Sequence, residues 1–151
     1  MQGLPSGQRR MPNKIINKGF IMPWLPVLFC LGFIFYASSI PGSSIPPLFA
    51  FQDIVFHFVI YLILGFLFIR ALRNTCLGIG WEKAIVFTII FGIIYGVNDE
   101  LHQGFAPYRC VSGLDVFIDS LGVFAGSLAY FFLKKHFNTV KKFYNKEFKV
   151  G

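Results

Sequence analysis

Four apolar segments, each close to the length of a membrane-spanning helix, alternate with shorter polar stretches along the chain. They cover residues 20–37, 51–69, 81–97 and 114–133. A spanning helix needs about 20 apolar residues, since a rise of ~1.5 Å per residue must cover ~30 Å of hydrocarbon. The pattern therefore predicts an all-α fold, a polytopic membrane protein built as a four-transmembrane-helix bundle.

The same pattern divides the chain into three parts. We expect a flexible basic N-terminus over residues 1–19, a four-span membrane domain over residues 20–133 and a basic cytoplasmic tail over residues 134–151. The tail is either a short interfacial helix or a solvated segment. A signal peptide is the alternative interpretation of the first apolar segment, but that segment is long for one and contains Phe, Tyr and Trp.

The composition supports a membrane location. Of the 151 residues, 55% are hydrophobic and 20 are Phe, and the mean hydropathy is +0.62, which is unusually apolar for a soluble domain. The net charge of +7 favours anionic lipid headgroups here, so we expect membrane lipids and no nucleic acid as partners. The three cysteines match neither a zinc motif nor a disulfide framework.

The basic residues predict the orientation in the membrane. With four spans, 13 of the 14 Lys and Arg residues lie on one side, and only Arg109 lies on the other. The positive-inside rule then places both termini in the cytoplasm and predicts a multi-pass protein of the cytoplasmic membrane. Acids contribute little to topology, so another cause is needed for the five that lie at or near the outer side: Asp53, Asp99, Glu100, Asp115 and Asp119.

Ionisable groups on three of the spans lie at a similar depth. Counted from the inner ends of their helices, His57, Asp99 and Asp119 lie about 20 to 24 Å above the inner boundary. Asp53, His57 and Tyr61 share one face of the second span, because residues four apart are neighbours on a helix. Ionisable groups at membrane depth mark a functional site by default, so we expect these groups to form one.

Glycines accompany the acids on the last two spans. One face carries Gly92, Gly96, Asp99 and Glu100, and the other carries Asp115, Asp119, Gly122 and Gly126. Small residues let membrane helices approach closely, so antiparallel packing of the two faces would bring Asp99 or Glu100 near Asp115 or Asp119. The alternative is that the glycine faces bind a protein partner or a second copy of the chain. Ser112 with Asp115 resembles a capping box at the start of the fourth span.

Several carboxylates at close range cannot all ionise in a low-dielectric site unless cations compensate them. The candidates in the sequence are Arg109, His57 and His102. A metal ion is a further option, but we assign no metal site and no cofactor. Arg109 either pairs with two carboxylates through its guanidinium or binds an anionic ligand such as phosphate. A salt-bridge network that only holds the helices together is the structural alternative.

These residues resemble the VanZ-like family of small bacterial membrane proteins. The resemblance rests on residues 38–41 (SSIP), on Asp53, His57 and Tyr61, and on Glu100, Gln103, Pro107, Arg109, Ser112, Asp115, Gly122 and Gly126 in that order. It covers about residues 24–133 and implies a four-span protein of the cell envelope, with a link to resistance against the glycopeptide teicoplanin. Ile54, Tyr108 and Asp119 depart from the family pattern. Ile54 stands where a Lys often provides a counter-charge, and Asp119 adds a negative charge where Asn is frequent.

Three functional hypotheses follow. In the first, an outward-opening polar site binds an anionic amphiphile, such as a lipid headgroup or a lipid-linked wall component, through Arg109, Asp115, Asp119, Gln103, Asp53 and His57. In the second, an intramembrane hydrolase or transferase uses Glu100, His102 or Asp99 in catalysis and Arg109 as a phosphate clamp. No HExxH or GxSxG motif supports catalysis. In the third, the chain is a helper subunit of a membrane complex.

Overall fold

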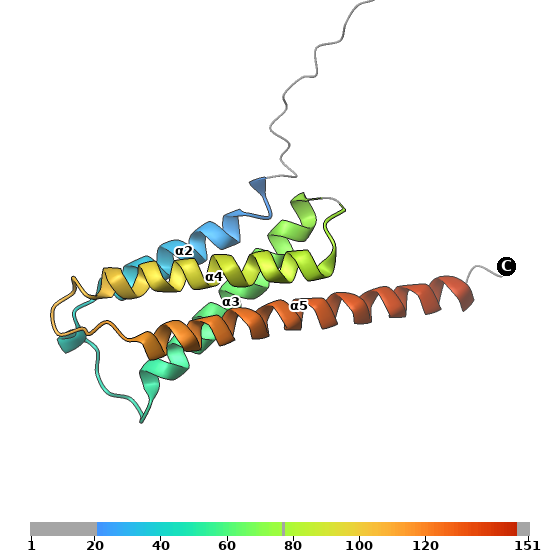
Figure 1. Ribbon diagram of the computed structural model, residues 1–151. Helices are drawn as coiled ribbons and strands as arrows, with labels where there is room; N and C mark the ends of the chain where they lie inside the picture. Colours follow the sequence, from blue (N-terminus) through green and yellow to red (C-terminus); the bar gives the residue numbers. More distant parts are fainter. Residues whose placement is uncertain (1–20, 77, 148–151) are drawn as a thin grey trace, which may run out of the picture.

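The computed structural model describes residues 21–76 and 78–147, and within them all regular secondary structure is helical. The elements are α2 (Leu25–Ser38), a short 3-10 helix η1 (Gly42–Ser44), α3 (Gln52–Thr75), α4 (Trp81–Gln103) and α5 (Gly113–Glu147) (Figure 1). Helices α3, α4 and α5 are long and apolar enough to cross a membrane, and α2 is a shorter apolar helix. The predicted all-α bundle is confirmed. The predicted flexible segment 1–19 lies outside the described residues.

Helix α2 begins later than the apolar pattern predicts. It starts at Leu25 rather than near residue 20, and Pro23 and Pro26 flank its first residue. Proline lacks a backbone N–H and is tolerated only in the first turn of a helix. The helix therefore has 14 residues, a length of about 21 Å. Its docking onto α4 includes a hydrogen bond from the Tyr95 hydroxyl to the Leu31 carbonyl oxygen, 2.8 Å.

Helix α5 is longer than the apolar pattern predicts. The fourth apolar segment ends at residue 133, but the helix continues to Glu147, and Figure 1 shows its C-terminal part projecting beyond the other helices. No glycine or proline follows Gly126 before the helix ends, so nothing in the sequence interrupts it. The first part of the tail is thus a straight continuation of the last apolar helix.

Close backbone contact between α3 and α5 forms the centre of the bundle. A Cβ atom on Gly126 would overlap the carbonyl oxygen of Leu62, and one on Gly122 would lie 2.6 Å from that of Phe58. On α4, by contrast, Gly92 and Gly96 face side chains of α5. The predicted packing of the two faces is therefore correct at Gly96, which meets Asp119, and wrong at Gly122 and Gly126, which face α3. The glycines of α5 make room for α3, which lies across α5 in Figure 1.

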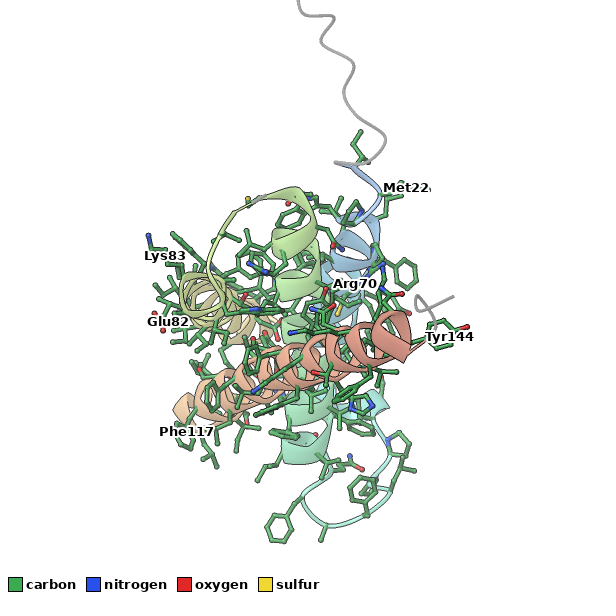
Figure 2. All side chains as sticks on the ribbon, turned by 90° about the vertical axis from the view of Figure 1, so that its right-hand side faces the viewer. Met22, Arg70, Glu82, Lys83, Phe117 and Tyr144 are labelled. Carbon is green, nitrogen blue, oxygen red and sulfur yellow. The ribbon has the colours of Figure 1, made fainter. Side chains whose placement is uncertain are left out.

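The loop that follows α2 and the loop that precedes α5 meet at one end of the bundle. The Gly42 N–H donates to the Pro107 carbonyl oxygen at 3.0 Å, and a side chain at Gly42 would overlap the backbone of Tyr108. Figure 2 looks onto the opposite end, where Arg70, Glu82 and Lys83 lie near the α3–α4 connection. Arg70 and Lys83 therefore lie at the end of the bundle opposite the loop that carries Arg109.

Candidate functional site

Polar side chains of α3, α4 and α5 meet beneath the two joined loops. The ring nitrogen Nδ1 of His57 lies 3.0 Å from Oδ1 of Asp119, which links α3 to α5. The Tyr61 hydroxyl donates to Oδ2 of Asp99 at 3.3 Å, which links α3 to α4. The predicted convergence of His57, Asp99 and Asp119 is confirmed.

Glu100 is the most enclosed acid of α4, with 1% of its surface exposed. Its Oε2 accepts a hydrogen bond from the Ser112 N–H at 2.7 Å. Its Oε1 is buried and has no hydrogen-bond partner among the described residues. Buried polar atoms in proteins nearly always have a partner, so this oxygen requires an explanation.

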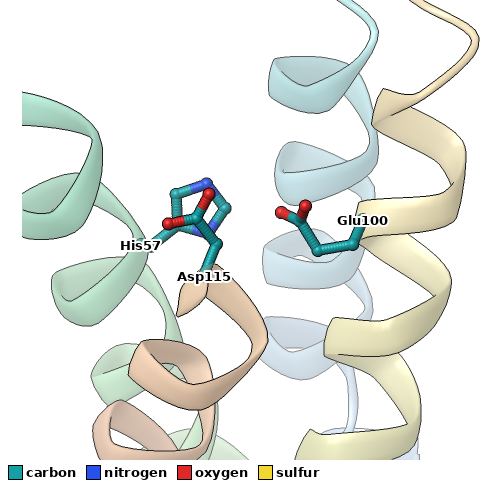
Figure 3. A group of neighbouring side chains, drawn as sticks. All are labelled: His57, Glu100 and Asp115. Carbon is teal, nitrogen blue, oxygen red and sulfur yellow. The ribbon is translucent and has the colours of Figure 1, made fainter. Parts of the chain in front are cut away.

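Asp115 lies in the first turn of α5, and Ser112 caps that turn. The Asp115 N–H donates to the Ser112 hydroxyl at 3.2 Å, so half of the predicted capping box is present. One ligand atom each from His57, Glu100 and Asp115 lies within 4.8 Å of the others. Figure 3 shows Glu100 pointing from α4 toward His57 and Asp115. The prediction that Glu100 lies near Asp115 is confirmed.

Asp119 is completely buried between α3 and α4. Its side chain is 0% exposed, and Oδ2 has no hydrogen-bond partner within the described part of the chain. A Cβ atom on Gly96 would lie 3.1 Å from this oxygen. Gly96 therefore provides the space in which Asp119 reaches His57.

A pocket of about 330 Å³ adjoins this cluster between α2, α3 and α4. Most of its wall is apolar and includes Phe33, Ile34, Ala37, Ile40, Ile45, Phe56, Val59 and Ile60. The rest is formed by the polar residues Ser38, Asp53, His57, Tyr61, Asp99, Gln103 and Arg109. His57 belongs both to the pocket and to the group with Glu100 and Asp115. The pocket therefore combines an apolar surface with a polar end, as amphiphile sites do.

Arg109 forms no ion pair with a carboxylate anywhere in the described residues. Its Nε donates to the Ile40 carbonyl oxygen at 3.4 Å, and Nη1 donates to Gln103 Oε1 at 3.3 Å. The alternative that the Arg109 guanidinium pairs with carboxylates such as Asp115 or Glu100 is therefore wrong. Gln103 is 4% exposed and holds the guanidinium at the wall of the pocket without neutralising it.

Two of the candidate residues lie at the margin of the site. His102 faces α2, where Nε2 lies 2.9 Å from the Ser39 hydroxyl and the ring stacks on Phe35 at 4.3 Å. It is neither in the pocket nor in the group with Glu100. Asp53 is exposed in the first turn of α3 and lines the pocket. Phe51 is the N-cap residue of α3, so Asp53 lies inside the helix and does not cap it.

The contacts of three further residues could not be predicted, although the sequence analysis names the residues themselves. Ile40 acts through its backbone carbonyl, which no side-chain pattern reports. Ser39 precedes it and bonds His102 from a loop. The spacing predicts the helix face on which Tyr61 lies. Its hydrogen bond to Asp99 follows only from the similar depth of the two residues in their helices.

Comparison with known proteins gives one match. The family model described as VanZ/LLP1 matches residues 20–134. No curated protein and no solved structure matches the chain. The matched region contains α2, α3, α4 and the part of α5 that carries Asp115 and Asp119.

Proposed function

The chain belongs to the VanZ/LLP1 family, and we propose that it binds an anionic amphiphile, such as a lipid headgroup or a lipid-linked wall component, in the pocket beside Arg109. The protein acts at the outer face of the cytoplasmic membrane of a bacterial cell. Glycopeptide tolerance, including that to teicoplanin, is the cellular property that this binding serves. Its direct partners are therefore membrane lipids rather than a soluble ligand.

The observation that carries this proposal is the position of Arg109. A guanidinium lines a mainly apolar pocket, and its two hydrogen bonds reach a side-chain amide and a backbone carbonyl rather than a carboxylate. Arginine presents a planar fork that matches phosphate and carboxylate groups. The apolar wall formed by α2 and α3 suits an acyl or prenyl chain, so one pocket accommodates both parts of an amphiphile.

Arg109→Lys and Arg109→Ala are each expected to weaken binding of phosphatidylglycerol about tenfold or more, because charge-assisted hydrogen bonds contribute about 1.5–3 kcal/mol each. The amount of folded protein is expected to stay unchanged, because Arg109 neutralises no carboxylate. Binding is measured by titrating the purified protein in a neutral detergent, with phosphatidylcholine as the reference lipid. Lys83→Ala at the opposite end is the control. Unchanged phosphatidylglycerol binding by Arg109→Ala would remove the guanidinium from the proposal.

The proposed orientation places both termini and the α3–α4 connection in the cytoplasm. Cys110 and Cys76 are exposed and lie in connections at opposite ends of the bundle, whereas Cys30 is buried. In intact cells, a membrane-impermeant maleimide is expected to label Cys110 and to leave Cys76 unlabelled until the membrane is opened. Cys110→Ser provides the blank. Labelling of Cys76 from outside would invert the topology.

An intramembrane hydrolase or transferase is the second candidate, and the free oxygen of Glu100 favours it. Glu100, Asp115 and His57 form a compact group of the kind that acid–base catalysis uses, and His57 connects this group to the pocket. If the protein is an enzyme, Glu100→Gln should abolish its cellular phenotype at unchanged lipid binding. If it only binds the lipid, the phenotype should remain. A helper subunit would have to meet its partner elsewhere than at Gly92, Gly96, Gly122 and Gly126, because this chain's own helices cover these glycines.

A further inference from the structure

We propose that His57, Glu100 and Asp115 form a binding site for one divalent transition-metal ion. One donor atom from each of the three side chains lies within 4.8 Å of the other two, and the three residues come from α3, α4 and α5 (Figure 3). Imidazole nitrogen and carboxylate oxygen are ordinary ligands of Zn²⁺ and of related ions. An ion at this point would tie three helices together.

The unpartnered oxygen of Glu100 points to a ligand at this position. Glu100 is 1% exposed. Its Oε2 accepts a hydrogen bond from the Ser112 N–H, whereas Oε1 has no hydrogen-bond partner among the described residues. In Figure 3 the carboxyl group is directed at His57 and Asp115. A metal ion between the three side chains would satisfy this oxygen without any change in the backbone.

Each proposed ligand is already oriented by a second residue. His57 uses Nδ1 for Asp119, which leaves Nε2 as the nitrogen for the metal. A carboxylate on the other ring nitrogen is the usual companion of a metal-bound histidine, because it fixes the ring and raises its basicity. Ser112 serves both acids, since its N–H binds Glu100 and its hydroxyl caps the turn that carries Asp115.

The charge of the cluster also favours a cation. Three acids, Glu100, Asp115 and Asp119, surround a single imidazole, and no Lys or Arg forms an ion pair with them in the described part of the chain. A divalent ion would balance the charges of two carboxylates in a site that is largely buried. At the 4.8 Å limit, a central ion would lie about 2.8 Å from each donor, roughly 0.7 Å beyond a normal zinc bond. Small side-chain rotations close that gap.

The metal site does not depend on the amphiphile. It lies behind His57, and Glu100 and Asp115 do not line the pocket. Three protein ligands leave further coordination positions open, as in catalytic rather than structural metal sites. A ligand phosphate in the pocket would thus lie on the other side of the same imidazole.

The test is a calorimetric titration with Zn²⁺ of the purified full chain, which carries no tag and has been treated with a chelator. It is carried out in neutral detergent without anionic lipid. The wild type is expected to bind one Zn²⁺ per chain. Glu100→Gln and Asp115→Asn are each expected to weaken that binding more than tenfold, and Asp119→Asn, which acts through His57, about 10–100-fold. Glu82→Gln and His136→Ala, which alter the same residue types outside the cluster, are the matched controls and should bind as the wild type does.

Co²⁺ provides a second readout in the wild type alone, in case the variants do not fold. Its visible spectrum should show nitrogen and oxygen ligation without the charge-transfer band of a thiolate. Absence of stoichiometric Zn²⁺ binding by the wild type, a thiolate band, or wild-type affinity in Glu100→Gln would each overturn the metal site. A chain that binds Zn²⁺ normally but no phosphatidylglycerol would retain the metal site and refute the amphiphile proposal.

Discussion

Replacing His57 by alanine is expected to lower the free energy of unfolding by about 3–5 kcal/mol, because it leaves a buried carboxylate without its partner. Asp119 is 0% exposed, and the His57 ring supplies its only hydrogen bond from a side chain in the described residues. Unfolding is measured by SDS titration in mixed micelles, with a chelator present so that a lost metal ion does not contribute.

A second substitution distinguishes an unpaired charge from lost packing. The double variant His57→Ala with Asp119→Ala removes both polar partners and is expected to be more stable than His57→Ala alone, since removing both partners costs less than orphaning one. His102→Ala is the matched control, because this ring is only half-buried and contacts Ser39 and Phe35. A single variant as stable as the wild type would show that Asp119 is neutral or solvated.

The sequence predicts the helical fold well because apolar length is a local property. Each of α3, α4 and α5 corresponds to one apolar segment. The errors occur where the cause is not hydropathy. Pro23 and Pro26 delay the start of α2, and the Lys-rich end of α5 remains helical because it contains no helix-breaking residue. Hydropathy reports where a helix can enter lipid, and it does not report where the backbone leaves the helical conformation.

The sequence also predicts which side chains converge, but it does not predict how they pair. Depth and face bring His57, Asp99 and Asp119 together correctly. Helix rotation is a tertiary property, so the sequence could not show that Gly122 and Gly126 face α3 instead of α4. For the same reason the sequence predicts that Glu100 lies near Asp115 but not that His57 completes this group. Its members come from three helices, and no local spacing relates them as it does in a zinc motif.

Gly126→Ala is expected to destabilise the bundle by about 3 kcal/mol, the upper end of the usual range for overpacking. A Cβ atom at this position would overlap the carbonyl oxygen of Leu62, a backbone atom that no side-chain rotation can move away. Helices α3 and α5 must therefore separate, and His57 moves away from Asp119 with them. The measurement is the midpoint of SDS-induced unfolding, together with the fraction of monodisperse protein after purification.

Gly113→Ala is the matched control, because it lies on the same helix and a Cβ atom there meets nothing within 4 Å. Alanine has a higher helix propensity than glycine by up to about 1 kcal/mol, so this control should be neutral or slightly stabilising. Gly126 lies in the helix interior, where Gly126→Ala gains at least as much propensity as Gly113→Ala at the first helical residue, so its net loss understates the steric conflict. The effect should persist in Asp119→Asn, because the clash involves backbone and not charge. Equal stability of Gly126→Ala and Gly113→Ala would mean that α3 and α5 do not pack through this glycine, and the route by which the bundle brings His57 to Asp119 would then have to be different.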